Sequence, residues 1–293
     1  MIYRYLLAVS LLLLPTLLSA EEKPTTATTT IKEKSKAFHG MELYFVRHAR
    51  TLANELNRHT EDLGRTLSKK GKVQVKELTA QLNTLQFDHI ISSPTVRTRK
   101  TLYPYLKARL ENPDTYMDFK KAELWTDLME CCWQKDKTLG LTPKDQVKTY
   151  QVFIDKKYHP YFHFPSGDYA IHRNTKTYAD GIAQMDRVIK LLKIRFSNSD
   201  KKILIVSHYL FLNQMIKRMA NIETEHKISS RNAQITKLVE QADGRFKMVI
   251  FNNAPMHGLD YPEYYEKYQR QREGAYQYQK NLEKKKAEAE LKK

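Results

Sequence analysis

Cysteine is nearly absent from this chain. Only Cys131 and Cys132 occur among its 293 residues, and they are neighbours. Two adjacent cysteines cannot supply the disulfide framework of a small secreted domain, and they are too few ligands for a structural zinc ion. A disulfide between neighbours strains the backbone, so we expect two half-buried thiols here.

Acidic residues are also in short supply. Aspartate and glutamate number 33 against 50 lysines and arginines, which gives a net charge of +17. Such a surplus attracts anions, including phosphate esters, nucleic acids and acidic membranes, and it serves solubility equally well. The chain lacks zinc-finger spacing, the aromatic signature of RNA-binding domains and a recognisable helix-turn-helix. Nucleic acid is therefore not the expected partner.

A long apolar run occurs at the amino terminus. Arg4 precedes a nearly continuous apolar stretch over residues 6–18, and the small residues Ser19 and Ala20 follow it. A charged start, an apolar middle and a small-residue cut site are typical of a signal peptide, here residues 1–20. The run is short for a membrane span, which needs about 20 apolar residues. We expect an exported protein, periplasmic or secreted, that meets a membrane only if this segment stays uncleaved.

The rest of the chain divides by its pattern. Residues 21–38 have no apolar period and are expected to form a flexible leader. Strand-like and helix-like segments alternate through most of residues 39–259, which predicts an α/β fold: a three-layer α/β/α sandwich around a mostly parallel sheet. The stretch 111–175 has a poor strand signal and is predicted to be a cap inserted over the sheet. Residues 260–293 are predicted to form a polar, charged helix or a frayed tail.

The pattern also locates individual elements. The predicted strands cover residues 41–46, 87–92 and 203–206, with a hairpin of 233–239 and 246–251 around Asp243-Gly244. The predicted helices cover residues 69–82, a segment opened by Pro94, 178–196 and 209–219.

Charged side chains follow three of these strands. Arg47 and His48 come directly after the first strand, Arg97 lies shortly after the second, and His208 follows the third. Ligands of an open parallel sheet bind at the carboxyl ends of its strands. One such residue alone is more often structural, whereas three positions together predict a shared site.

This set of side chains suits phosphoryl transfer. Guanidinium groups match phosphate oxygens in pairs, and a neutral imidazole can form a covalent phosphoryl intermediate. A second imidazole can stabilise the charge of the transition state, and a carboxylic acid must protonate the leaving oxygen. Positioning and charge neutralisation suffice for this chemistry, so we expect no metal or other cofactor.

Residues 41–54, MELYFVRHARTLAN, resemble the opening motif of the histidine phosphatase superfamily, in its phosphoglycerate mutase-like, Arg-His-Gly branch. The likeness spans roughly residues 41–259 and continues in order through LSKKG at 67–71, SSP at 92–94, VSH at 206–208 and NAQIT at 232–236. It implies a phosphoglycerate mutase-like fold and a phosphatase that hydrolyses small anionic phosphomonoesters through a phosphohistidine. Its nucleophile would be His48.

The resemblance also implies roles for the neighbours of His48. Arg47 and Arg97 would bind the phosphoryl group, and His208 would complete the pocket. Thr51 and Asn54 match positions that support substrate binding.

The proton donor is less sharply defined by the resemblance. Glu130, in the sequence Leu-Met-Glu, fits the expected Leu-x-Glu pattern best, and Asp127 and Glu123 stay open as alternatives.

Three residues depart from the family pattern. Ala49 replaces the usual glycine, a mild change. Arg50 replaces a common acid, and it either binds a second anionic group or faces solvent. Tyr209 replaces a small residue, and it would crowd the pocket or stack on a substrate ring.

A phosphomutase of the same superfamily, or a catalytically weak phospholigand-binding protein, stays open as the alternative. The sequence leaves the oligomeric state undecided.

Overall fold

The computed structural model of the protein describes residues 38, 40–132, 149–175, 177–223 and 228–291. The expected signal peptide, and the expected leader apart from Phe38, lie outside the described residues, as do residues 133–148 of the expected cap. Among the residues that are described, no helix is long and apolar enough to cross a membrane.

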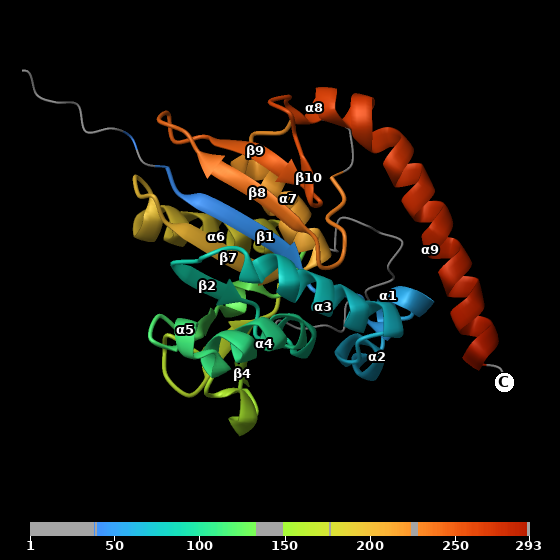
Figure 1. The fold of residues 1–293 in the computed structure, drawn as a ribbon, viewed down its shortest axis with the longest axis horizontal. Coiled ribbons are helices and arrows are strands. Elements are labelled where there is room, and N and C mark those ends of the chain that lie inside the picture. The colour runs from blue at the N-terminus through green and yellow to red at the C-terminus, as the bar shows by residue number, and fades with distance from the viewer. Residues whose placement is uncertain (1–37, 39, 133–148, 176, 224–227, 292–293) are drawn as a thin grey trace, which may run out of the picture. The chain divides into compact units, whose positions relative to one another are not determined.

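A sheet of eight strands forms the centre of the domain, in the order β10-β9-β8-β1-β7-β2-β3-β5 (Figure 1). Five strands run parallel to one another: β1 (Glu42–Arg47), β7 (Lys202–Ser207), β2 (His89–Ser92), β3 (Ala122–Leu124) and β5 (Phe162–His163). An antiparallel extension completes the sheet beyond β1: β8 (Ile235–Glu240), β9 (Phe246–Phe251) and β10 (Ala254–Pro255).

Helices connect and cover these strands. The described α-helices are α1 (Leu52–Leu56), α2 (Glu61–Arg65), α3 (Lys69–Asn83), α4 (Val96–Glu111), α5 (Pro113–Tyr116), α6 (Tyr178–Phe196), α7 (Tyr209–Met219), α8 (Tyr261–Tyr264) and α9 (Arg270–Leu291). Shorter helical turns are η1 (Thr126–Leu128), η4 (Lys156–Tyr158) and the π-helical η5 (Tyr265–Gln269).

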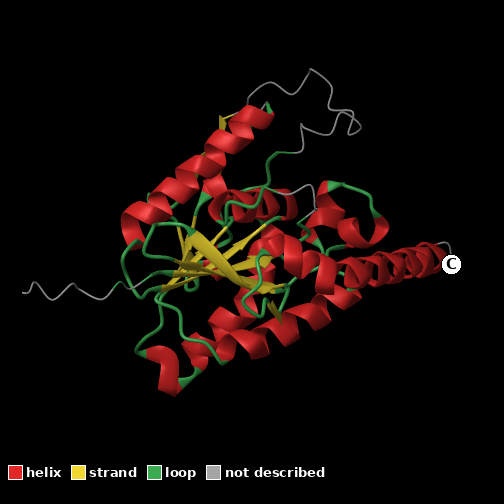
Figure 2. Cartoon of the chain, turned by 90° about the horizontal axis from the view of Figure 1, so that it is seen from above, coloured by secondary structure: helices red, strands yellow, loops and turns green. Residues whose placement is uncertain are grey.

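Side chains of the central strands alternate between two cores, as the pleat of a strand requires. On β1, Leu43 and Phe45 pack with residues of α6 and α7, whereas Tyr44 and Val46 pack with residues of α3 and α4. The sheet therefore lies between helical layers on both faces (Figure 2). This confirms the expected three-layer α/β/α sandwich with a mostly parallel sheet.

Local signals explain where the helices begin. The Ser68 side chain accepts a hydrogen bond from the Gly71 amide and caps α3, while Thr177 and Asp180 form a capping box at α6. Such caps satisfy amide groups that have no partner within the helix. α6 and α7 have the bounds that the apolar spacing predicts, because each buries one strongly apolar side.

The stretch 111–175 differs from its prediction as a cap over the sheet. β3 and β5 lie within it, yet both belong to the central sheet. Among the described residues of this stretch, β4 (Thr149–Val152) and β6 (Ala170–Arg173) form a separate two-stranded antiparallel sheet. The prediction is wrong for β3 and β5 because strands of three and two residues are too short to show an alternating pattern.

The two cysteines also differ from expectation. Cys131 and Cys132 form a disulfide and both are buried, so the prediction of two thiols is wrong. Cys132 adopts a left-handed conformation with φ of 71°. α6 passes tightly over the pair at Gly181, where an added β-carbon would lie 2.8 Å from the Cys132 sulfur.

Candidate active site

The nucleophile candidate lies in a loop that three other segments hold. The His48 amide donates to the carbonyl of Ser207, at the end of β7, over 3.0 Å. The Asn232 side chain donates to the His48 carbonyl over 2.7 Å, and the Thr101 hydroxyl accepts from the Ala49 amide over 2.8 Å. These bonds fix the backbone on both sides of the His48 side chain, which is buried.

The hydrogen bond of the His48 ring determines its tautomer. Nδ1 lies 2.8 Å from the carbonyl oxygen of Ala49, and a carbonyl only accepts, so Nδ1 carries the hydrogen. The lone pair of Nε2 is then free for attack on an electrophile. Burial lowers the pKa of His48 well below its usual value, and the charges of Arg97 and Arg47 lower it further. The ring is therefore neutral, which nucleophilic attack requires.

His208 faces His48 across the end of the sheet. The ring centroids are 5.4 Å apart and the rings are inclined by 60°. Arg97 donates from Nε to Nδ1 of His208 over 3.1 Å, so Nε2 carries the hydrogen and donates to the Ser93 hydroxyl over 2.8 Å. Burial, followed by the charge of Arg97, lowers the pKa of His208 well below its usual value. The segments that follow β1, β2 and β7 thus come together at the carboxyl ends of these strands, where the sequence pattern predicts a shared site.

Arg47 is oriented by two contacts that leave part of its guanidinium without a partner. Nη1 donates to the Ser230 carbonyl over 3.1 Å, and the guanidinium carbon lies 4.5 Å from the centre of the Tyr209 ring. Its buried Nε has no hydrogen-bond partner. An unpaired buried donor costs free energy, and an anion bound beside Arg47 would supply its acceptor. Tyr209 stacks on this arginine, where the sequence predicted crowding or contact with a substrate ring.

Glu130 joins the same cluster. One of its carboxylate oxygens accepts from the amides of Leu210 and Phe211, at the start of α7, each over 3.1 Å. Burial raises the pKa of Glu130, and this outweighs the amides and the nearby Arg97 and Arg47, which lower it. A carboxyl group with a raised pKa beside two arginines suits the proton-donor role that the family resemblance implies for Glu130.

The alternative acids have other partners. Both oxygens of Asp127 accept from Arg187, over 2.8 and 2.9 Å. Both oxygens of Glu123 accept from Arg195, over 2.6 and 2.8 Å, which lowers the pKa of Glu123. Both alternative acids are thus engaged by arginines of α6, whereas Glu130 contacts the start of α7 directly after His208.

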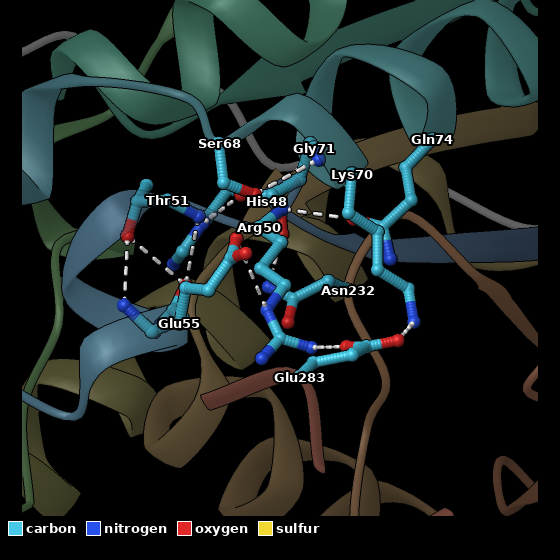
Figure 3. Close-up of polar contacts among 12 residues, drawn as sticks. His48, Arg50, Thr51, Glu55, Ser68, Lys70, Gly71, Gln74, Asn232 and Glu283 are labelled. Atoms are coloured by element: carbon cyan, nitrogen blue, oxygen red, sulfur yellow. Dashed lines mark hydrogen bonds and ion pairs between the residues drawn. The ribbon is translucent and has the colours of Figure 1, made fainter. Parts of the chain in front are cut away.

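The remaining predicted residues lie beside the cluster. Thr51 and Asn54 hydrogen-bond to one another and form the capping box of α1, which sets the path of the chain after the nucleophile. Arg50 is buried, which excludes the alternative that it faces solvent. Its Nη1 donates to Glu283 of α9 over 2.7 Å, and Lys70 donates to the other oxygen of Glu283 (Figure 3).

Several contacts of the site are not apparent from the sequence. Ser93 and Ser230 act on His208 and Arg47 through hydrogen bonds, and serines are too common in loops to stand out. Burial lowers the pKa of Arg47, and the electrostatic interaction with Tyr276 of α9 acts in the opposite direction. Within the described ranges, no three or more His, Cys, Asp or Glu side chains form a group that could hold a metal ion.

The match to a known family agrees with this geometry. The sequence profile of the histidine phosphatase superfamily (branch 1) matches residues 43–254, so the chain belongs to this superfamily. A Schizosaccharomyces pombe protein described as a probable phosphatase is 31% identical over 88 residues. That alignment covers 30% of this chain and 42% of the yeast protein, so it spans less than half of the relative.

Solved structures with similar folds share little sequence with this chain. Phosphoglycerate mutase from Bacillus anthracis is 18% identical with a TM-score of 0.49, and the match covers 74% of this chain and 94% of that one. A phosphoserine phosphatase from Entamoeba histolytica is 19% identical with a TM-score of 0.46, covering 72% and 96%. The alpha-ribazole phosphatase from Shigella flexneri is 17% identical with a TM-score of 0.47, covering 75% and 100%.

Proposed function

We propose that this protein is a phosphatase that hydrolyses phosphomonoesters through a phosphohistidine on His48. The observation that carries the proposal is the state of that ring. It is neutral, its Nε2 lone pair is free, and the two arginines that lower its pKa lie at the same point. A neutral nucleophile next to fixed cations is the arrangement that phosphoryl transfer needs, because the reaction depends on positioning and charge neutralisation.

The reaction would take two steps. In the first, Nε2 of His48 attacks phosphorus, the bond to the leaving oxygen breaks, and Glu130 gives its proton to that oxygen. In the second, the Glu130 carboxylate takes a proton from a water molecule, which attacks the phosphohistidine and releases inorganic phosphate and neutral His48. Arg47 and Arg97 would neutralise the phosphoryl oxygens in both steps.

His208 contributes to this scheme through Arg97. Both of its ring nitrogens have protein partners, so it orients the Arg97 guanidinium by accepting from Nε. A direct hydrogen bond from His208 to a phosphoryl oxygen would require exchange of one of these partners on substrate binding.

The test is phosphate release from p-nitrophenyl phosphate and a panel of metabolite phosphomonoesters by the purified protein. We expect turnover, and a loss of at least about a thousandfold in His48→Ala, because the covalent route disappears. Equal rates for the two proteins would refute the role of His48. Phosphorus NMR on the same reactions separates hydrolysis from the mutase alternative, which would move the phosphoryl group within one substrate with little phosphate release.

Export belongs to this proposal as well, since residues 1–20 carry the pattern of a signal peptide. Sequencing the amino terminus of the protein isolated from its natural source should find a start near Glu21. A start at Met1 in a cytosolic fraction would refute export.

A further inference from the structure

Charged and aromatic groups attach the C-terminal helix α9 to segments that carry residues of the candidate active site. One attachment is Arg231, whose guanidinium lies 4.6 Å from the Tyr276 ring and donates to the Arg272 carbonyl over 3.2 Å. A second attachment is Glu283, which bridges Arg50 and Lys70. Both attachments lie close to pocket residues in the chain, because Arg50 is two residues after His48 and Arg231 follows Ser230.

The Glu283 attachment has the geometry of an anion site. Each carboxylate oxygen has its own cation: Oε2 accepts from Arg50 Nη1 over 2.7 Å, and Oε1 accepts from Lys70 Nζ over 2.5 Å. Figure 3 shows the carboxylate between the two cationic groups. The Arg50 side chain is only 3% exposed, and its Nη2 has no hydrogen-bond partner. A guanidinium and an ammonium that converge in this way would also bind a phosphate group.

Glu283 keeps its charge in this position. Burial acts to raise its pKa, but the hydrogen bond from Lys70 and the charges of Lys70 and Arg50 outweigh this, so its pKa is lowered. Arg50 lies close enough to Arg47 for its charge to act on that arginine. The carboxylate of Glu283 is therefore the binding partner of Arg50 and Lys70. Arg47 and Arg97 remain to bind one phosphoryl group.

We propose that Glu283 is a specificity-determining residue. By filling the site between Arg50 and Lys70, it restricts the enzyme to substrates with one phosphate and an uncharged leaving group, and it excludes substrates with a second phosphate near the first. The proposal rests on the phosphatase function, whose substrate class it narrows. Removing the charge of Glu283 would free Lys70 Nζ and Arg50 Nη1 for the second phosphate of a bisphosphate, while Arg50 Nε keeps its ion pair with Glu55 at 3.8 Å.

The turnover test compares fructose 6-phosphate with fructose 1,6-bisphosphate. In Glu283→Gln, the ratio of kcat/KM for the bisphosphate to that for the monophosphate should rise about tenfold or more, the usual effect of a gained hydrogen bond to a charged group. Glu290→Gln is the matched control. Glu290 lies on α9, like Glu283, and this variant removes its exposed ion pair with Lys69 of α3. The kcat/KM ratio of this variant should stay within twofold of wild type. Glu283→Asp, which keeps the charge, should also retain a low ratio.

A binding measurement does not depend on turnover. Calorimetric titration with inorganic phosphate should find one site in the wild type and two in Glu283→Gln, and Lys70→Ala in that background should remove the second site. Glu283→Ala frees the same cations and replaces the glutamine variant if that protein is unstable. A gained site without turnover in any protein would support this inference and refute the phosphatase proposal. One site and an unchanged ratio in both Glu283 variants would overturn the inference and leave Glu283 as a docking residue.

Discussion

Gly71 lies so close to Arg50 that a β-carbon on the glycine would be 1.9 Å from the Arg50 carbonyl oxygen. The same carbonyl accepts from the Ser68 amide over 3.0 Å. The first turn of α3 is therefore packed directly on the backbone that follows His48. This contact fixes the position of the loop that carries His48 from a helix more than twenty residues away.

The Gly71→Ala variant tests this contact. The methyl group meets backbone, which cannot rotate away, so the loop after His48 must shift. A displacement near 1 Å can reduce catalysis about a hundredfold, and we expect a fall in kcat/KM of at least tenfold together with a lower Tm. The control is Gly64→Ala in α2, where nothing lies within 4 Å of the added carbon. It should keep its activity, and equal activity in both variants would contradict the account.

Glu130→Gln tests the proton donor through the leaving group. Gln keeps the shape but cannot protonate the departing oxygen, so hydrolysis of alkyl phosphates should fall about 10² to 10⁴-fold. The first step with p-nitrophenyl phosphate should fall much less, because p-nitrophenolate departs without a proton. Burst kinetics separate this step from hydrolysis of the phosphoenzyme. A uniform loss across leaving groups, or the selective loss in Asp127→Asn instead, would contradict the assignment.

The dependence of kcat/KM on pH follows from two opposite pKa shifts. His48 must be neutral, which holds above its lowered pKa, and Glu130 must be protonated, which holds below its raised pKa. Activity should therefore be bell-shaped with an acidic maximum. Glu130→Gln should abolish the alkaline limb and keep the acidic one. An alkaline limb that persists in this variant would assign it to a different group.

A buried carboxylate at the opposite end of β1 provides a test of stability. Glu240 accepts from the Met41 amide, the Ser197 hydroxyl and the Asn198 amide. Removing it leaves these donors without their acceptor, so Glu240→Ala should lower the free energy of unfolding by about 2–4 kcal/mol in urea titrations.

The control for this variant is Glu266→Ala, which removes an exposed ion pair with Arg270. Its free energy of unfolding should change by less than about 1 kcal/mol. A Glu240→Ala change no larger than this would show that the buried carboxylate contributes little.

The parts of the fold with strong local signals could be predicted from the sequence. α6 and α7 each place apolar residues at helical spacing, and the buried strands β1 and β7 are continuous apolar runs. Strand order then brings His48, Arg97 and His208 to one edge of the sheet, because parallel strands share their carboxyl ends. The positions of the buried strands and their parallel order are enough to locate the candidate active site.

Other features depend on contacts between distant segments. Nothing in the polar sequence of α9 distinguishes Glu283 from its other glutamates, and its role depends on Arg50 and Lys70, more than 200 residues earlier. The rival acids Asp127 and Glu123 pair with arginines of α6, whereas Glu130 is buried and accepts from amides of α7. Charge pairing between segments leaves no periodic signal in either segment, so the sequence alone left these choices open.

Trapping of the phosphoenzyme tests the central claim most directly. The protein is mixed with a ³²P-labelled phosphomonoester and quenched in alkali within milliseconds, and the labelled peptide is identified by mass spectrometry. The account predicts a label on His48 that survives alkali and is lost in acid, as expected for a phosphorus–nitrogen bond, and no label in His48→Ala. Full phosphatase activity with no labelled intermediate, or with the label on another residue, would contradict it.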